Sequence, residues 1–259
     1  MPDKNKVGAI IQARTGSSRL PGKVLKILAG KTVLEHVIER IRQSKVIGDI
    51  IIATTEHEKD NSIDAIATKV GVSCFRGSED DVLSRYYYAA KEHAVKTVIR
   101  ITSDCPLIDP KLCDEVISFY LQHHGQYVLV TNAGPGTKER TYPRGLDLEV
   151  FSYNVLEEAF HGATRNYQRE HVTPWIYERY KDNIHYYKND VDYSNYRWTL
   201  DTVEDYSLIR EIYGNLYRGE HNFYFADILR LFQENPGLSL VNGHVIQKTY
   251  NGIPLNTDI

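Results

Sequence analysis

Short apolar runs alternate with stretches of helical periodicity through the first half of the chain. Runs with the length and aliphatic character of strands buried on both faces occupy residues 7–13, 49–53, 72–75 and 97–102. Apolar side chains spaced three and four residues apart predict amphipathic helices near 32–41, 61–70, 81–90 and 109–121. Strands that alternate with helices favour a mainly parallel sheet with helices on both faces, which is a three-layer α/β/α fold.

The pattern is less regular in the second half, where we expect an elaboration on the sheet at 132–195. This part contains a Gly/Pro-rich loop and predicted elements at 146–151 (an exposed strand), 152–161 and 169–179 (helices), and 185–188 and 196–200 (antiparallel strands). It has neither a linker nor a core of its own, so we expect a single domain over 1–259. Helices are predicted again around 203–212 and 225–232, and a surface tail at 244–259.

A basic loop follows the first apolar run. It reads Arg14-Thr-Gly-Ser-Ser-Arg-Leu-Pro-Gly-Lys23, and no acidic residue occurs between Asp3 and Glu35, where seven lysines and arginines do. Small residues let backbone N–H groups approach a ligand, and unopposed cationic side chains add fixed charge. The loop therefore predicts a site for a polyphosphate.

Two common phosphate-binding motifs do not fit this loop. The segment from Gly16 to Lys23 is one residue too long for GxxxxGK[ST], Val24 stands where the hydroxyl should be, and there is no GxGxxG. Residues 9–25 instead resemble the nucleotide-binding loop of the sugar cytidylyltransferases, such as the acylneuraminate and ketodeoxyoctulosonate cytidylyltransferases. The resemblance is greatest to the branch that serves spore-coat polysaccharide synthesis.

The resemblance implies a fold, a reaction and partners. The fold is the Rossmann-like one of nucleotide-diphospho-sugar transferases (GT-A type), with a mainly parallel sheet and a small antiparallel elaboration. The reaction transfers CMP from CTP to a sugar, in particular an acidic ulosonic or nonulosonic sugar, and releases pyrophosphate, for surface or spore-coat polysaccharide. Mg²⁺ is the implied cofactor, and a homodimer through 132–165 is the implied assembly.

The resemblance also assigns residues to the nucleotide. Arg14 and Lys23 contact the triphosphate, and with Asp104 they form the expected catalytic set. The expected nucleotide-binding residues are Ala13, Arg14, Ser17, Ser18, Arg19, Lys23, Thr54, Arg76 and Ser103. A surface arginine beside a helix cap explains Arg76 equally well.

Two acids follow strand-like runs that are remote in sequence. Asp104 comes after 97–102, and Asp201 comes after 196–200. Carboxylates at the ends of strands, facing a phosphate loop, suit a divalent cation that bridges phosphate oxygens. In the cytidylyltransferases the equivalent acids hold magnesium. Asp201 also fits a helix N-cap, and Thr199 stands where some relatives have another acid, which puts a second metal in doubt.

Segments 143–149 and 169–173 resemble the acceptor-sugar segments of the family. The expected sugar-binding residues are Arg144, Glu149, Arg169 and His171. An arginine would meet the carboxylate of an acidic sugar as a bidentate pair. An ordinary polar helix face is the competing explanation of His171.

Composition narrows the possible partners. A net charge of −3, with 42% apolar and 25% charged residues, gives no chain-wide attraction to nucleic acid or to an anionic membrane. Three cysteines without CxxC spacing predict reduced thiols, and no segment resembles a signal peptide or a membrane span. We therefore expect a cytoplasmic protein that binds CTP and a small sugar.

The sequence is also compatible with three alternative functions. A nucleotidyltransferase for another base or a GT-A glycosyltransferase would share the fold. The absence of an Asp-x-Asp around residue 104 disfavours the glycosyltransferase. A binding scaffold without turnover is the non-enzymatic alternative, and the presence of Arg14, Lys23, Asp104 and Asp201 argues against it.

Overall fold

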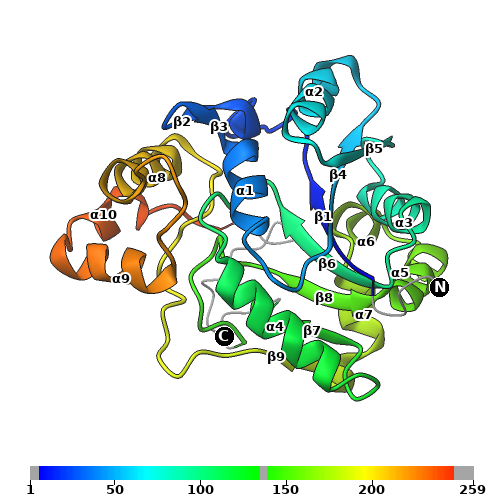
Figure 1. The fold of residues 1–259 in the computed structure, drawn as a ribbon. Helices are drawn as coiled ribbons and strands as arrows, with labels where there is room; N and C mark the ends of the chain where they lie inside the picture. Colours follow the sequence, from blue (N-terminus) through cyan, green and yellow to red (C-terminus); the bar gives the residue numbers. More distant parts are fainter. Residues whose placement is uncertain (1–5, 135–138, 248–259) are drawn as a thin grey trace.

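The computed structural model describes residues 6–134 and 139–247, and a seven-stranded sheet runs through its centre (Figure 1). The strands are β1 (Val7–Gln12), β4 (Asp49–Thr55), β5 (Ser73–Gly77), β6 (Thr97–Thr102), β7 (Leu129–Thr131), β8 (Glu149–Ser152) and β9 (Ile184–Tyr186). Their order is β5-β4-β1-β6-β8-β7-β9. Strand β8 pairs antiparallel with both neighbours and the other pairs are parallel, so the sheet is mainly parallel as predicted.

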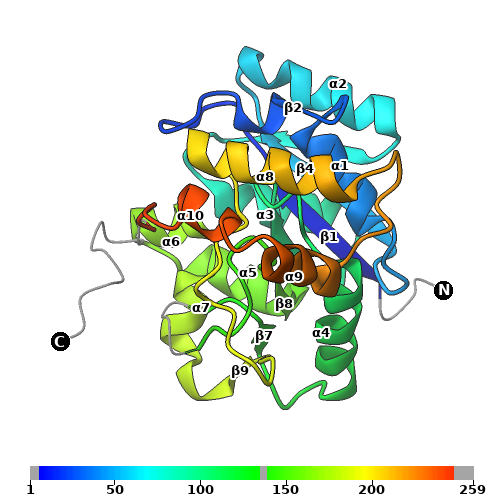
Figure 2. The ribbon, with the colours of Figure 1, turned by 90° about the vertical axis from the view of Figure 1, so that its left-hand side faces the viewer.

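Helices cover both faces of this sheet. They are α1 (Val33–Ile41), α2 (Asn61–Val70), α3 (Val82–Glu92), α4 (Pro110–Gln122), α5 (Tyr153–Gly162), α6 (Asn166–His171), α7 (Pro174–Arg179), α8 (Val203–Leu216), α9 (Phe225–Glu234) and α10 (Leu238–Asn242). One core joins the sheet to α1, α2, α4, α8 and α9, and the other joins it to α3, α5 and α7. Figure 2 shows α8, α9 and α10 nearest the viewer.

The sheet and the helix starts follow from the sequence pattern. In β1, Ala9 and Ile11 enter one core and Ile10 enters the other, and all three are fully buried. Continuous apolar runs are required where both faces of a strand are covered. Thr32 caps α1 through a capping box with Glu35, and Asp109 caps α4 ahead of a proline.

Several predictions for the second half are wrong. The strand predicted as exposed at 146–151 is the buried β8, because α4 and α5 pack against its two faces. Residues 196–200 form no strand and make one isolated bridge, between Arg144 and Arg197. Strand β9 pairs parallel with β7 instead of antiparallel.

The predicted helix at 169–179 is two helices. Val172 separates α6 from α7 with a φ of 72°, which is unfavourable for a β-branched residue, and Pro174 begins α7. A two-stranded hairpin of β2 (Ile27–Leu28) and β3 (Lys31–Thr32) was not predicted. The last twelve residues of the predicted surface tail and part of the 132–143 loop lie outside the described residues.

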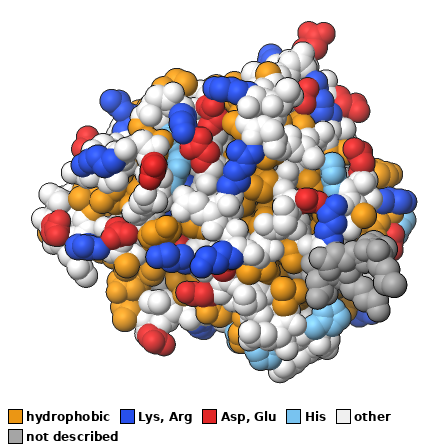
Figure 3. All heavy atoms as spheres, in the orientation of Figure 1, with side chains coloured by type: hydrophobic (Ala, Val, Ile, Leu, Met, Phe, Trp, Pro, Cys, Tyr) orange, Lys and Arg blue, Asp and Glu red, His pale blue; other side chains and the backbone are white. Residues whose placement is uncertain are grey.

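The distribution of charged side chains on the surface agrees with the small net charge of the chain. Lys and Arg side chains are interspersed with Asp and Glu over the face in Figure 3. The basic loop is therefore a local feature of a surface that carries both signs. None of the helices in 6–134 or 139–247 has the length and apolar character that crossing a membrane requires.

Candidate active site

A pocket of about 320 Å³ lies at the carboxyl ends of the central strands. Strand β1 lies between β4 and β6, so the loops that follow these strands share one rim of the sheet. The pocket is lined by Gln12, Ala13, Arg14, Gly16, Ser17, Ser18, Arg19, Lys23, Val82, Arg85, Thr102, Ser103, Asp104, Glu170, His171 and Asp201. Most of the predicted nucleotide residues and both predicted metal ligands are among them.

A buried acid fixes the basic loop to the neighbouring strand. Asp60, which is 3% exposed, accepts hydrogen bonds from Thr15 N at 2.8 Å and Thr15 Oγ1 at 2.7 Å, and also binds Thr55. Gly22 N then donates to Thr15 O at 3.0 Å, with a φ of 66° at Gly22. These hydrogen bonds hold the loop in one conformation, so that its cationic side chains lie together. Asp60 was not among the predicted site residues.

Lys23 lies between the two predicted metal ligands. Its Nζ donates to Asp104 Oδ2 at 2.6 Å and to Asp201 Oδ1 at 2.8 Å. Arg19 Nη2 lies 2.9 Å from the other oxygen of Asp201. Leu200 N donates to Asp104 O at 2.8 Å, so the segment that carries Asp201 is fixed directly beside Asp104. Three segments that are distant in sequence therefore converge on one ionic cluster.

The cluster keeps its members charged. Burial favours neutral Lys23, but Asp104 and Asp201 outweigh it and raise the pKa of the ammonium. Burial likewise opposes ionisation of Asp201, whereas Lys23, Arg19 and Arg197 lower its pKa to about 2. Both groups are ionised at neutral pH.

The two carboxylates fit a divalent cation by their chemistry. Asp104 Oδ2 and Asp201 Oδ1 are both within 2.8 Å of the same cationic atom, so one ion can contact both. Mg²⁺ prefers oxygen ligands and is commonly held by one or two carboxylates together with substrate phosphates. The pair, next to a polyphosphate loop, is suited to that role.

Side chains of α3 and α6 form another part of the pocket lining. Arg85, 1% exposed, donates to Ser78 O and Glu79 O, and its presence in the pocket lining was not predicted. Burial lowers the pKa of His171, with smaller contributions from Glu170, which raises it, and from Arg100 and Arg14. Gln12 Oε1 is buried and finds no hydrogen-bond partner among the described residues. This part of the pocket therefore offers the cation of Arg85 and the polar side chains of His171 and Gln12 to a second substrate.

Two predicted nucleotide residues are not in the pocket lining. Thr54 is completely buried. Arg76 donates to Thr55 O at 3.0 Å, His57 O at 3.1 Å and Asn61 Oδ1 at 2.7 Å, and so ties β5 to the loop after β4. A nucleotide contact for either stays a prediction.

The predicted sugar residues are brought together only in part. His171 lines the pocket. Arg169 donates to Asp81 and to Phe160 O at 2.6 Å, outside the lining. Glu149 is buried against Arg100 and accepts from Tyr177 Oη at 2.8 Å. The backbone of Arg144 forms an isolated β-bridge with that of Arg197, through hydrogen bonds to Tyr196 O and from Trp198 N. Their contact with a sugar stays a prediction.

The comparison that decides the family covers almost the whole chain. The sequence profile of the cytidylyltransferases matches residues 8–244. The chain belongs to the cytidylyltransferase family. This confirms the predicted family and the prediction of a CTP-dependent nucleotidyltransferase.

Individual relatives agree with this assignment. This cytidylyltransferase is 32% identical over 245 residues to the spore coat polysaccharide biosynthesis protein SpsF of Bacillus subtilis (strain 168), with 90% of this chain and 96% of that protein covered. The 8-amino-3,8-dideoxy-manno-octulosonate cytidylyltransferase of Shewanella halifaxensis is 33% identical over 130 residues, 48% of this chain and 51% of that enzyme.

A solved structure supports the fold. The cytidylyltransferase from Leptospira borgpetersenii serovar Hardjo-bovis (strain JB197) superposes with a TM-score of 0.84 at 37% identity. The match covers 90% of this chain and 96% of that one. The three-layer arrangement and the mainly parallel sheet are therefore those of a cytidylyltransferase.

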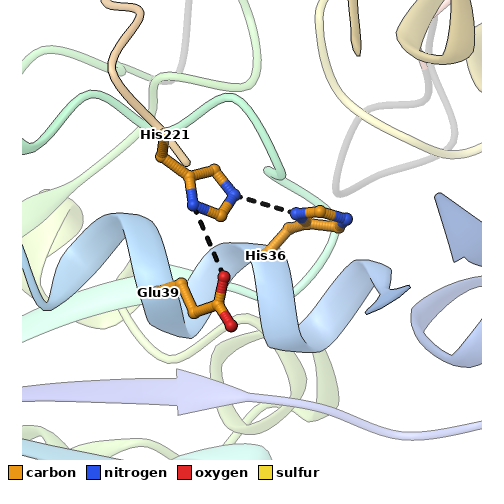
Figure 4. Close-up of side chains that lie close together, drawn as sticks. All are labelled: His36, Glu39 and His221. Carbon is orange, nitrogen blue, oxygen red and sulfur yellow. Dashed lines mark hydrogen bonds and ion pairs between the residues drawn. The ribbon is translucent and has the colours of Figure 1, made fainter. Parts of the chain in front are cut away.

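A second polar cluster of this cytidylyltransferase lies on α1, away from the pocket lining (Figure 4). His36 Nδ1 and His221 Nε2 are 2.8 Å apart, and His36 Nε2 contacts Leu28 O at 2.5 Å. His221 Nδ1 is 3.5 Å from Glu39 Oε2, whose carboxylate also binds Lys31 at 2.7 and 2.8 Å. The rings are 0% and 5% exposed, and their close contact is a hydrogen-bond distance. We interpret the cluster as a structural contact between α1 and the segment before α9.

This cluster predicts acid sensitivity. Burial, Arg40, His36 and Lys31 together lower the pKa of His221 to about 3, and burial also lowers the pKa of His36. The unfolded chain, with a histidine pKa of about 6.5, binds more protons below that pH, so stability falls as pH drops from about 6.5 towards 3. The expected slope is up to about 1.4 kcal/mol per pH unit for each proton.

Urea unfolding of the wild type at pH 7, 5.5 and 4.5 measures this slope. We expect His221→Phe to have a flatter dependence than the wild type, whatever its stability at pH 7. The exposed His161, replaced by Gln, is the control and should leave the slope unchanged. Equal slopes in the wild type and His221→Phe would show that this histidine pair does not cause the acid sensitivity.

Proposed function

We propose that this cytidylyltransferase transfers the CMP group of CTP to a hydroxyl of an acidic sugar and releases pyrophosphate, in the synthesis of a surface or spore-coat polysaccharide. The observation that carries the proposal is the contact of Lys23 with both Asp104 and Asp201 in a pocket formed by the basic loop. The name of SpsF and the octulosonate substrate of the Shewanella relative support the class of product and the acidic acceptor.

The phosphate end of the pocket accounts for the transfer. The sugar hydroxyl oxygen forms a bond to the α-phosphorus and its proton is released to solvent, while the bond to the pyrophosphate oxygen breaks, so negative charge accumulates on the departing group. Arg14, Arg19 and Lys23 line the pocket and supply fixed positive charge, which favours that state over the bound triphosphate. Mg²⁺ bound by Asp104 and Asp201 would neutralise phosphate charge further.

The part of the pocket lined by α3 and α6 would receive the sugar. Arg85 and His171 line it, together with the amide of Gln12. We assign the carboxylate contact to Arg85 because Arg169, one of the two arginines expected to make it, is occupied by Asp81 and by Phe160 O. Arg85 is well placed by its burial, since a cation shielded from water binds an anion more strongly.

Two broader features of the resemblance remain part of the proposal. A homodimer through 132–165 is the assembly that the resemblance to the family implies. A cytoplasmic location agrees with the use of CTP and with the three free cysteines, of which Cys105 and Cys113 are buried. Neither feature is needed for the assignment of the active site.

The reaction is tested by measuring pyrophosphate release with CTP, UTP, ATP and GTP against a panel of sugars. The panel should pair eight- and nine-carbon ulosonic acids with neutral sugars of similar size. We expect release only with CTP and an acid, and no release without a divalent cation. Release with a neutral sugar alone would exclude the acidic acceptor, and release with UTP in place of CTP would exclude the base assignment.

Base preference can also be measured without turnover. A ligand that binds only the folded state stabilises it by about 2.7 kcal/mol at one hundred times its Kd. We expect CTP with Mg²⁺ to raise the melting temperature more than UTP, ATP or GTP at equal concentration. An equal or larger shift with UTP would favour a nucleotidyltransferase for another base.

A further inference from the structure

Arg197 lies directly behind one of the two acids that bind Lys23. The side chain is 7% exposed, and its Nε and Nη2 donate to Asp205 Oδ1 and Oδ2, each at 2.9 Å. The same Nη2 donates to Asp201 Oδ2 at 2.9 Å. One guanidinium therefore connects two carboxylates. The ammonium of a lysine lacks the planar set of N–H donors that this arrangement uses.

Asp205 sets the charge of this arrangement. It is completely buried, and its Oδ2 accepts from Asp201 N at 2.9 Å and from Thr202 N at 3.0 Å. Because Asp205 compensates the charge of Arg197, the guanidinium can orient Asp201 while the group of three keeps one negative charge. Asp201 remains an anion that a cation can bind.

We infer that Arg197 is a positioning residue for the nucleotidyl transfer proposed above, on which this inference rests. Its guanidinium fixes Asp201 Oδ2 and so turns Oδ1 towards the point that it shares with Asp104 Oδ2. A carboxylate held in one orientation by a neighbouring group binds a metal ion more tightly than one that must be ordered on binding. Arg197 is not among the residues that line the pocket.

The C-terminal helix α10 completes the support. Asn242, which is 3% exposed, donates through Nδ2 to Arg197 O and to Asp205 Oδ1, each at 2.8 Å. Gln247 Oε1 accepts from Arg197 Nη1. Asn242 therefore holds both the backbone of Arg197 and its partner acid Asp205. These contacts connect the last described residues to the expected metal-binding acids.

The test measures Mn²⁺ binding by electron paramagnetic resonance in the presence of CTP, without sugar. We expect Arg197→Lys to raise the Kd for Mn²⁺ by about 10- to 100-fold, the range seen when groups that orient metal ligands are removed. Binding of CTP without metal should change little, and high metal concentration should restore turnover. A purely structural role would instead lower the melting temperature and leave the Kd for Mn²⁺ unchanged, which would overturn the inference.

Two further variants make the result unambiguous. Arg140→Lys is the matched control, since Arg140 is also buried, at 3% exposed, and binds Asp147 outside the pocket lining. Asn242→Ala removes two hydrogen bonds without a charge, and it serves if Arg197→Lys does not fold, with a smaller rise in the Kd expected. If Asp104→Asn also leaves Mn²⁺ binding unchanged, the proposed function fails. If Asp104→Asn abolishes binding and Arg197→Lys and Asn242→Ala do not affect it, only the role of Arg197 fails.

Discussion

Replacement of Asp104 by asparagine is expected to reduce kcat by at least 10²- to 10³-fold, the loss typical of removing one group that stabilises charge in a transition state. The amide keeps the shape of the side chain and can still accept a hydrogen bond from Thr102. It lacks the charge that a divalent cation and Lys23 both require. The melting temperature should stay near that of the wild type, because Asp104 lies at the pocket and not in either core.

Steady-state kinetics over a range of Mg²⁺ concentrations measure this effect. Asp49→Asn provides the control, because Asp49 also pairs with a lysine, at 2.8 Å, but lies at the opposite end of β4. Asp49→Asn should keep full activity. If Asp104→Asn were fully active at saturating Mg²⁺, Asp104 would not be a metal ligand.

The phosphate end of the site was predictable from sequence because its chemistry is local. Ten consecutive residues supply the loop, its cations and its turn, and the apolar run before them fixes the loop at a strand end. Asp104 was predictable for the same reason, since it follows β6 within two residues. The rule that ligands lie at the carboxyl ends of parallel strands then brings these pieces together without knowledge of the pairing.

The supporting residues were not predictable, because their partners are remote. Asp60 reads as part of a polar loop, and its contact with Thr15 becomes visible only once β1 and β4 are paired. Arg85 reads as a polar position of an amphipathic helix, although it is 1% exposed. Arg197 lies in a segment that was predicted as a strand and is not one, so its neighbours could not be inferred.

The acceptor residues were predicted from the family motif alone, and their contact with a sugar stays a prediction. The segment around Arg169 matches the family pattern, but the fold directs this side chain to Asp81, the N-cap residue of α3. A motif fixes which residues are present, whereas the packing of α6 on α3 fixes where they point. The second half of the chain also has short elements, for which periodicity carries little information.

Replacement of Lys23 by methionine is the second large effect, and it should act on three observables at once. Methionine keeps the length of the side chain without the charge. We expect kcat/KM for CTP to fall by about 10²- to 10³-fold, because the ammonium would stabilise the departing pyrophosphate. The control is Lys69→Met, since Lys69 pairs with Glu35 at 2.8 Å but is 72% exposed. Unchanged kcat/KM in Lys23→Met would remove Lys23 from the catalytic set.

The other two observables separate an electrostatic role of Lys23 from a structural one. Lys23 lowers the pKa of Asp201 more than any other group does, so its loss should raise that pKa and shift the acidic limb of the pH–rate profile to higher pH. Without the ammonium, Asp104 and Asp201 repel each other, and Mn²⁺ alone should then raise the melting temperature of the variant more than that of the wild type. A variant that is destabilised but shows neither the pH shift nor the response to Mn²⁺ would mean that Lys23 supports the loop without acting on the two acids.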